Sequence, residues 1–116
     1  MSGLSKLQKR LREFAAARDW DQFHSPKNLS MALSVEAAEL VEHFQWLTEE
    51  QSGSLDTERL AQVRLEAADV FIYLLRLADK LGIDLLQAAD EKMALNEQKY
   101  PAQRVRGDSR KYSDYD

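Results

Sequence analysis

The chain has 116 residues, a formal net charge of −4 and no cysteine. This length predicts a single domain over residues 1–116, because single domains are usually of about this size. The lack of cysteine excludes disulfides, zinc–thiolate sites, iron–sulfur clusters and thiol nucleophiles. The first residues lack the apolar segment of a secretory signal, and no apolar run approaches the roughly 20 residues of a membrane span. We therefore expect a cytoplasmic protein without a membrane partner.

Apolar residues recur at helical spacing, and Gly and Pro fall at the boundaries of the periodic segments. We expect helices at about residues 5–18, 26–47, 57–81 and 85–99, followed by a polar, basic tail over 101–116. Ser25 before Pro26 is a helix-start signature, Gly82 has the place of a helix-ending glycine, and Asp84 that of the next N-cap. No segment alternates long enough to be a strand. The predicted fold class is all-α, with four helices in a bundle.

The charge is distributed unevenly along the chain. From Asn28 through Glu58 there are seven acidic residues and no Lys or Arg, whereas both ends are basic. An acidic centre between basic ends suits a divalent cation together with a polyanionic small ligand. It does not suit a nucleic-acid polymer, because such binders carry a basic excess. A solvated acidic face is the alternative, and charge alone favours that alternative.

Two pairs of carboxylates lie within apolar helix faces rather than opposite them. Glu36 and Glu39 share an apolar face of the second predicted helix, and Glu66 and Asp69 share one of the third. Burying ionised carboxylates requires a compensating charge, and the second helix has no basic residue after Lys27. One or two hard cations with oxygen ligands would compensate them, with Mg²⁺ expected and Mn²⁺ as a substitute. The alternative is neutralisation by Lys and Arg from the first and fourth helices.

The motifs Glu36-x-x-Glu39 and Glu66-x-x-Asp69, on two helices of a small all-α chain, resemble those of the MazG-like nucleoside triphosphate pyrophosphohydrolases. The surrounding sequence resembles the dCTP pyrophosphatase branch of that family, from about Leu7 onward. The blocks that carry this resemblance run from Arg18 to His24, Glu39 to Trp46, Asp69 to Leu74, Lys99 to Pro101 and Arg106 to Tyr112.

The resemblance implies Mg²⁺-dependent hydrolysis of a nucleoside triphosphate, foremost dCTP or a modified dCTP, to the monophosphate and pyrophosphate. It implies that the metal ligands and catalytic residues are Glu36, Glu39, Glu66 and Asp69. It implies a nucleotide pocket formed by Trp20, Asp21, Gln22, Phe23, His24, Trp46 and Tyr73. Lys92 and Asn96 lie one turn apart on the fourth predicted helix, so we add them as candidates for phosphate contacts.

The chain departs from the family pattern at two positions. Leu11 stands where some relatives have a histidine, and Val35 occupies the first position of the common Glu-Glu-x-x-Glu pattern. These departures bear on base specificity more than on the reaction. A related pyrophosphohydrolase acting on dUTP, another non-standard nucleotide or phosphoribosyl-ATP is therefore an alternative. A non-catalytic helical interaction module with structural acidic stripes is an alternative of another class.

The third predicted helix is apolar on almost every side, with Phe71, Leu74 and Leu75 away from the acidic pair. A helix of this kind is usually buried on several sides, which indicates a partner subunit in so small a protein. The family resemblance implies dimers or tetramers built from dimers. We expect a homo-oligomer, and we favour a dimer of dimers over a simple dimer.

Overall fold

The computed structural model describes residues 2–109, and within this range it contains helices and no strand. The all-α prediction is confirmed for this part of the chain. The chain divides after Gly82 into two compact units, which are described separately. Arg110, Lys111 and Tyr112, which belong to the basic tail and its resemblance to the family, lie outside the described residues.

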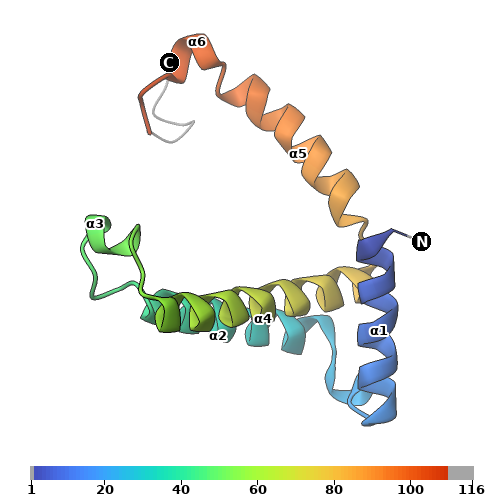
Figure 1. Ribbon diagram of the computed structural model, residues 1–116. Helices are drawn as coiled ribbons and strands as arrows, with labels where there is room; N and C mark the ends of the chain where they lie inside the picture. Colours follow the sequence, from blue (N-terminus) through green and yellow to red (C-terminus); the bar gives the residue numbers. More distant parts are fainter. Residues whose placement is uncertain (1, 110–116) are drawn as a thin grey trace. The chain divides into compact units, whose positions relative to one another are not determined.

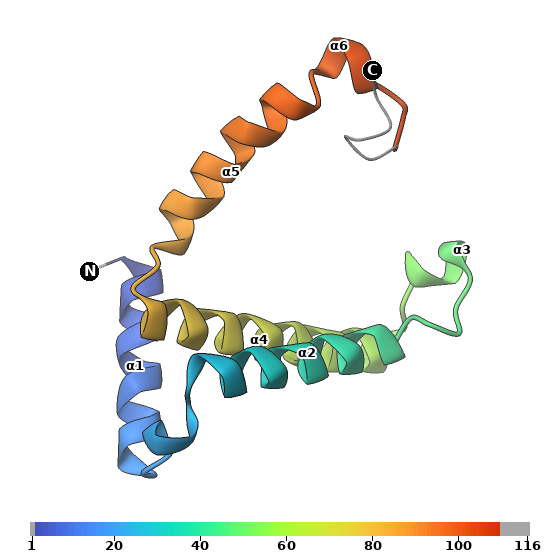
Figure 2. The same ribbon diagram turned by 180° about the vertical axis from the view of Figure 1, so that it is seen from behind.

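The first unit is built on a pair of antiparallel helices (Figures 1 and 2). Helices α2 (Pro26–Glu42) and α4 (Thr57–Leu81) lie side by side along most of their length. Helix α1 (Gly3–Ala17) packs against α4 near the C-terminal end of that helix. The short helices η1 (Asp21–Phe23) and α3 (Glu49–Ser52) lie in the connections before and after α2.

The helix boundaries follow local capping chemistry. The Ser25 side chain accepts a hydrogen bond from the Asn28 backbone N–H at 3.1 Å, and Pro26 begins α2. Gly82 ends α4 in the left-handed conformation at φ 66°, where a side chain would be strained. Asp84 accepts from the Gln87 backbone N–H at 3.1 Å and starts the next helix. These three predicted boundaries are confirmed.

The second predicted helix is shorter than expected, because α2 ends at Glu42 rather than at residue 47. Beyond it, the backbone turns tightly, with the N–H groups of His43 and Phe44 bonded three residues back. Arg59 of α4 donates a hydrogen bond to the His43 carbonyl at 2.8 Å, so a tertiary contact satisfies this helix end. The apolar spacing of Phe44 and Leu47 continued past this point, which explains the overestimate.

Two further helices occupy segments that were predicted as loop or tail. Helix α3 lies in the polar stretch after α2 and begins with a capping box between Thr48 and Gln51. Helix α6 (Ala102–Val105) lies at the start of the tail, directly after Pro101. Both are single turns, too short for apolar periodicity to reveal.

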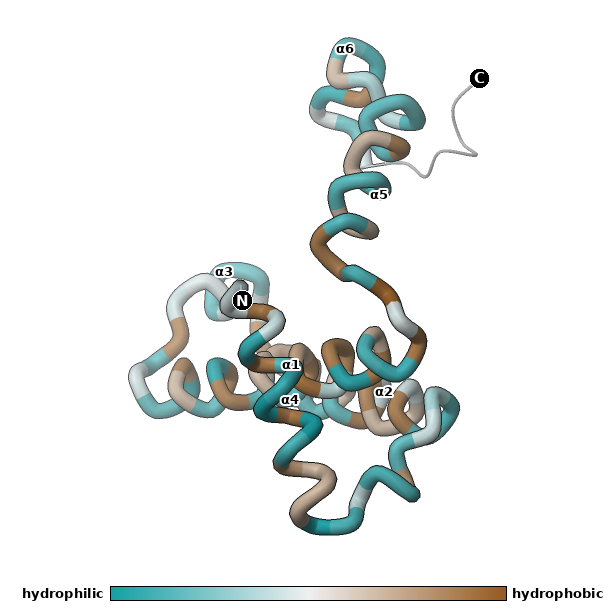
Figure 3. The backbone as a smooth tube through the Cα atoms, turned by 90° about the vertical axis from the view of Figure 1, so that its right-hand side faces the viewer, coloured by the Kyte–Doolittle hydropathy of each residue, from teal (hydrophilic) through white to brown (hydrophobic). Residues whose placement is uncertain are grey.

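The buried core of the first unit is small. Its fully buried large side chains are Leu29 of α2 and Leu75 of α4, joined by Ala15, Ala78 and the charged Arg76. Figure 3 shows apolar positions along the helices, and many of their side chains remain exposed in this chain. On α2 and α4 the exposed large apolar residues are Met31, Val35, Val41, Leu60, Leu65, Phe71, Leu74 and Leu81. Among residues 2–109, no helix combines the length and apolar character that spanning a membrane requires.

The second unit consists of α5 (Leu85–Lys99) followed by α6. Its candidates for phosphate contacts, Lys92 and Asn96, lie one turn apart on α5, as expected from their spacing. The role assigned to them stays a prediction, because the two units are not placed relative to each other.

Candidate active site

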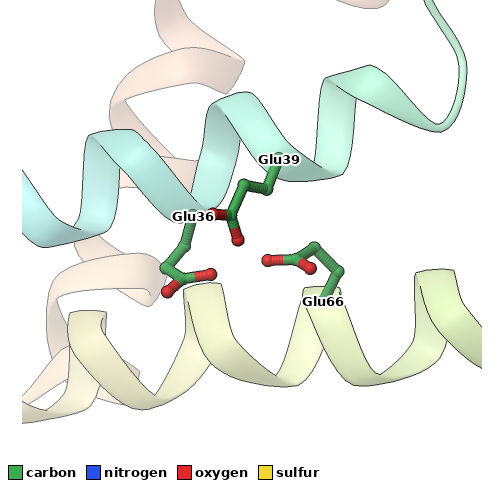
Figure 4. Close-up of side chains that lie close together, drawn as sticks. All are labelled: Glu36, Glu39 and Glu66. Carbon is green, nitrogen blue, oxygen red and sulfur yellow. The ribbon is translucent and has the colours of Figure 1, made fainter.

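Three carboxylates meet between α2 and α4. Glu36 and Glu39 lie three residues apart on α2 and therefore share one face of that helix. The antiparallel α4 brings Glu66 to this face, and Figure 4 shows its carboxylate directed toward the other two. Each residue offers an oxygen, and these three oxygens all lie within 4.8 Å of one another. The cluster therefore concentrates negative charge at one point between the helices.

The electrostatics of Glu36 reflect this crowding. A hydrogen bond with Glu66, partial burial and the nearby Glu39 raise the pKa of Glu36 to about 7. Asp69 contributes a smaller charge repulsion in the same direction. One buried oxygen of Glu36 and one of Glu66 have no hydrogen-bond partner among residues 2–109. Unpaired buried carboxylate oxygens are costly, so this cluster is incomplete as protein alone.

The donor set fits a hard divalent cation. Oxygens in adjacent positions around Mg²⁺ are about 3 Å apart and opposite oxygens about 4 Å apart, because Mg–O distances are 2.0–2.1 Å. The three carboxylate oxygens need to move only slightly closer together to reach that spacing. None of the ion pairs among residues 2–109 involves Glu36, Glu39 or Glu66, so a cation would also supply the missing charge. Asp69 does not belong to this group of three, although its charge acts on Glu36.

Asp69 instead lines a cavity of about 430 Å³ between α1 and α4. The cavity places three of the predicted pocket residues beside it: Trp20, His24 and Tyr73. Tyr73 follows Asp69 by one helical turn, so both side chains face the same side of α4. The acidic cluster and an aromatic-lined cavity are thus connected through Asp69 within the first unit.

Trp20 is held at the cavity by aromatic contacts from α1. Its ring lies edge-on to that of Phe14, with 5.7 Å between the centroids, and it remains 45% exposed. The Arg18 guanidinium lies 3.6 Å from the centre of the Phe14 ring. A half-exposed indole beside a cavity offers a flat face on which a base can stack.

The residues between Trp20 and His24 have other contacts. Asp21 pairs with Arg76 and Lys80 of α4, and the Gln22 amide donates to the backbone and side chain of Asp19. Phe23 is 60% exposed, and its carbonyl accepts a hydrogen bond from Asn28. None of these three lines the cavity. Their proposed substrate contacts therefore have no support from this geometry.

Trp46 also lies outside the cavity. It follows the end of α2, and its side chain is 87% exposed. Nothing within the described chain covers this ring. Its assignment to the nucleotide pocket stays a prediction.

The cavity includes residues that the sequence did not assign to a site. From α1 these are Leu7, Arg10, Leu11, Phe14 and Ala15, and from α4 they are Ile72 and Arg76. A signal existed for Arg76, because it continues the polar stripe of Asp69 and Tyr73 at helical spacing. The apolar α1 residues follow the ordinary pattern of a core-facing helix, so their spacing could not be distinguished from packing. The family resemblance had singled out only Leu11 among them, as a position where some relatives have a histidine.

Comparison with known proteins agrees with this arrangement. A family model described as the MazG-like family matches residues 31–115. The chain belongs to the MazG-like family. It is 45% identical over 104 residues to the Homo sapiens protein named dCTP pyrophosphatase 1, and the Mus musculus protein of that name gives the same values. These matches cover 88% of the chain and 61% of each relative, so the chain spans about three fifths of their length.

A solved structure of another protein has the same fold as this chain. The crystal structure of a pyrophosphatase from Archaeoglobus fulgidus superposes with a TM-score of 0.82 at 41% sequence identity. The match covers 87% of this chain and 94% of that chain. The resemblance to MazG-like pyrophosphohydrolases inferred from the sequence is thus confirmed at the level of the family.

Proposed function

We propose that this protein is a metal-dependent nucleoside triphosphate pyrophosphohydrolase that acts on dCTP or a modified dCTP. The observation that carries the proposal is the cluster of Glu36, Glu39 and Glu66 next to an aromatic-lined cavity. One buried oxygen of Glu36 and one of Glu66 lack partners among residues 2–109. The relatives named dCTP pyrophosphatase 1 support this substrate, and the family supports this reaction class.

The metal would be held by Glu36, Glu39 and Glu66, with Asp69 as a fourth ligand from the cavity side. A bound Mg²⁺ would offset the charge of the triphosphate and increase the acidity of coordinated water. Mn²⁺ would substitute, because it accepts the same carboxylate and water ligands.

The chain's own residues would orient the substrate along the line from cavity to cluster. Trp20 would stack on the base, and the Tyr73 hydroxyl, one turn from Asp69, would contact the sugar or a phosphate oxygen. One carboxylate of the cluster would accept the proton of the attacking water. The water oxygen would bond to the phosphorus that carries the nucleoside, and the bond from that phosphorus to the oxygen bridging to the second phosphate would break. Pyrophosphate would leave, and the monophosphate would remain.

The assembled protein would be a homo-oligomer, with a dimer of dimers favoured. The exposed large apolar residues on α2 and α4 support this proposal, because monomers rarely leave such surfaces uncovered. Lys92 and Asn96 of α5 would contribute phosphate contacts in that assembly.

The test is turnover on a panel of nucleotides with Mg²⁺, followed by identification of the products. We expect dCTP or 5-substituted dCTP to yield a monophosphate and pyrophosphate at the highest kcat/KM. A higher kcat/KM for dUTP, another non-standard nucleotide or phosphoribosyl-ATP would contradict the proposed substrate but support the proposed reaction. The absence of turnover together with no Mg²⁺ or Mn²⁺ binding by calorimetry would favour a non-catalytic helical module.

A further inference from the structure

Arg76 is a buried cation that joins two parts of the first unit. Its side chain is 6% exposed, and Nη2 donates a hydrogen bond to Oδ1 of Asp21 at 2.8 Å. Its Nε donates to Nδ1 of His24 at 3.3 Å. Its Nη1 lies 3.7 Å from Oδ2 of Asp79, one turn further along α4. One guanidinium therefore fixes the segment after α1 to the end of α4.

The contact with His24 determines where the imidazole carries its proton. A guanidinium has only donors and stays charged, so the atom that faces its Nε must be an acceptor. Nδ1 of His24 is therefore unprotonated, and the neutral ring carries its hydrogen on Nε2. His24 in this form presents a hydrogen-bond donor, and not an acceptor, to anything beyond Arg76.

The surroundings also favour the neutral imidazole over the charged one. Partial burial and the Arg76 charge lower the pKa of His24, and Lys80 adds to this effect. Asp21 acts in the opposite direction, but its Oδ1 is already shared between Arg76 and Lys80, the latter at 2.6 Å. The Asp21 carboxylate thus contacts cations rather than the imidazole.

His24 is available to a ligand in this state. It lines the same cavity as Arg76, Trp20, Tyr73 and Asp69. Within residues 2–109, its Nε2 forms no hydrogen bond. The free Nε2–H is therefore a donor beside the indole on which the base is proposed to stack.

We propose that Arg76 is a positioning residue, which holds His24 in the Nε2–H form so that His24 donates a hydrogen bond to an acceptor atom of the bound nucleoside. This inference rests on the proposed function, because it takes the cavity as the nucleoside site. The His24 Nε2–H donor would select the orientation of the substrate, since a carbonyl oxygen or ring nitrogen of the base can accept its hydrogen bond. A base N–H at the same place would face another N–H and leave both unpaired.

The direct test is the tautomer of His24 in the full-length protein, read from long-range ¹H–¹⁵N correlation spectra at pH 8. We expect wild-type His24 to show an unprotonated Nδ1 and a protonated Nε2. A spectrum with the proton on Nδ1, or with rapid averaging of the two forms, would overturn the proposal without any variant being needed.

Variants then connect the tautomer to binding. Arg76→Lys keeps the charge near Asp21 but lacks the second donor arm, so we expect averaged His24 signals and a KM for dCTP raised about tenfold, with kcat nearly unchanged. His24→Gln, whose amide supplies a donor, should retain more of the wild-type affinity than His24→Leu. An unchanged KM in Arg76→Lys and His24→Leu would contradict the proposal.

The matched control is Lys9→Gln. Lys9 is an exposed residue of α1 that lies outside the cavity, and no ion pair within residues 2–109 involves it. We expect this variant to leave both the His24 spectrum and the KM unchanged. A wild-type protein with the expected tautomer but no nucleotide turnover would refute the proposed function while leaving the Arg76–His24 contact established, so the two failures are distinguishable.

Discussion

The environment of Glu36 differs strongly from that of a surface carboxylate. Glu66, Glu39 and Asp69 surround it with negative charge, and one of its buried oxygens lacks a partner within the described chain. A carboxyl group in such a place binds its proton more tightly when the protein is folded than when it is unfolded. Protonation therefore stabilises the metal-free fold, and a bound cation would replace the proton.

This difference predicts how the stability of the metal-free protein depends on pH. The pKa of Glu36 is about 7 in the fold and 4.5 as its ordinary value, so the folded state binds more protons between these pH values. The free energy of unfolding should therefore fall as pH rises from about 4.5 to about 7 and then level off.

Melting temperatures measured in EDTA, for the wild type and for Glu36→Gln, check this pH dependence. Glu36→Gln should lose this part of the pH dependence and melt several degrees higher at pH 8, since ~1 kcal/mol shifts Tm by about 4–8 °C. Equal pH dependence in the two proteins would contradict it.

At the scale of single residues, the sequence predicted the acidic pairs better than the pocket. Carboxylates within an apolar periodic face are visible as an anomaly, and Glu36, Glu39 and Glu66 do lie together in the structure. Arg76 continues the polar stripe of Asp69 and Tyr73, but its contacts were not predictable, because its partners His24 and Asp21 lie 52 and 55 positions away. Pairings at that separation depend on how the helices pack, which no local spacing encodes.

At the scale of helices, boundaries set by local chemistry were predictable and those set by packing were not. Ser25, Gly82 and Asp84 act through contacts within a few residues of themselves, so their sequence signatures were sufficient. The end of α2 depends on Arg59 of α4, whose contact with the His43 carbonyl spans 16 positions. The periodic pattern alone therefore extended that helix too far.

The small core predicts which helix position matters most for folding. Leu75 of α4 is 0% exposed, so Leu75→Ala should reduce the free energy of unfolding by about 2–5 kcal/mol through lost burial and the cavity left behind. Gln62→Ala, at an exposed position on the same helix, should change it by less than about 0.5 kcal/mol. Urea unfolding followed by circular dichroism measures both. A similar loss in the two variants would show that Leu75 does not anchor the core.

At the scale of the whole molecule, the sequence indicated apolar surface that a single chain leaves uncovered. The apolar character of the 57–81 segment was the signal, and in the structure Leu60, Leu65, Phe71 and Leu74 of α4 are indeed exposed. Sequence could not say which copies would cover them, because interfaces depend on surfaces from several helices. Assembly therefore stays a prediction that a solution measurement must decide.

Sedimentation equilibrium at micromolar concentration measures that assembly. We expect the mass of a tetramer, four times the 13.3 kDa of one chain. The mass of a dimer, twice that of one chain, is the weaker alternative. Leu65→Glu, which places a charge on an exposed apolar position of α4, should lower the mass by weakening the interface. A wild-type mass of 13.3 kDa would refute the proposed oligomer.

Product analysis of dCTP turnover distinguishes the proposed function most directly from its alternatives. With Mg²⁺ present, ³¹P NMR should show dCMP and pyrophosphate for the wild type and for Glu58→Gln, an exposed first-turn residue of α4. Glu66→Gln should release pyrophosphate at least about 100-fold more slowly, because it removes a ligand from the proposed metal site, while its circular dichroism stays helical. Release of dCDP and inorganic phosphate, or near-normal turnover by Glu66→Gln, would contradict a carboxylate-held metal that directs cleavage to pyrophosphate.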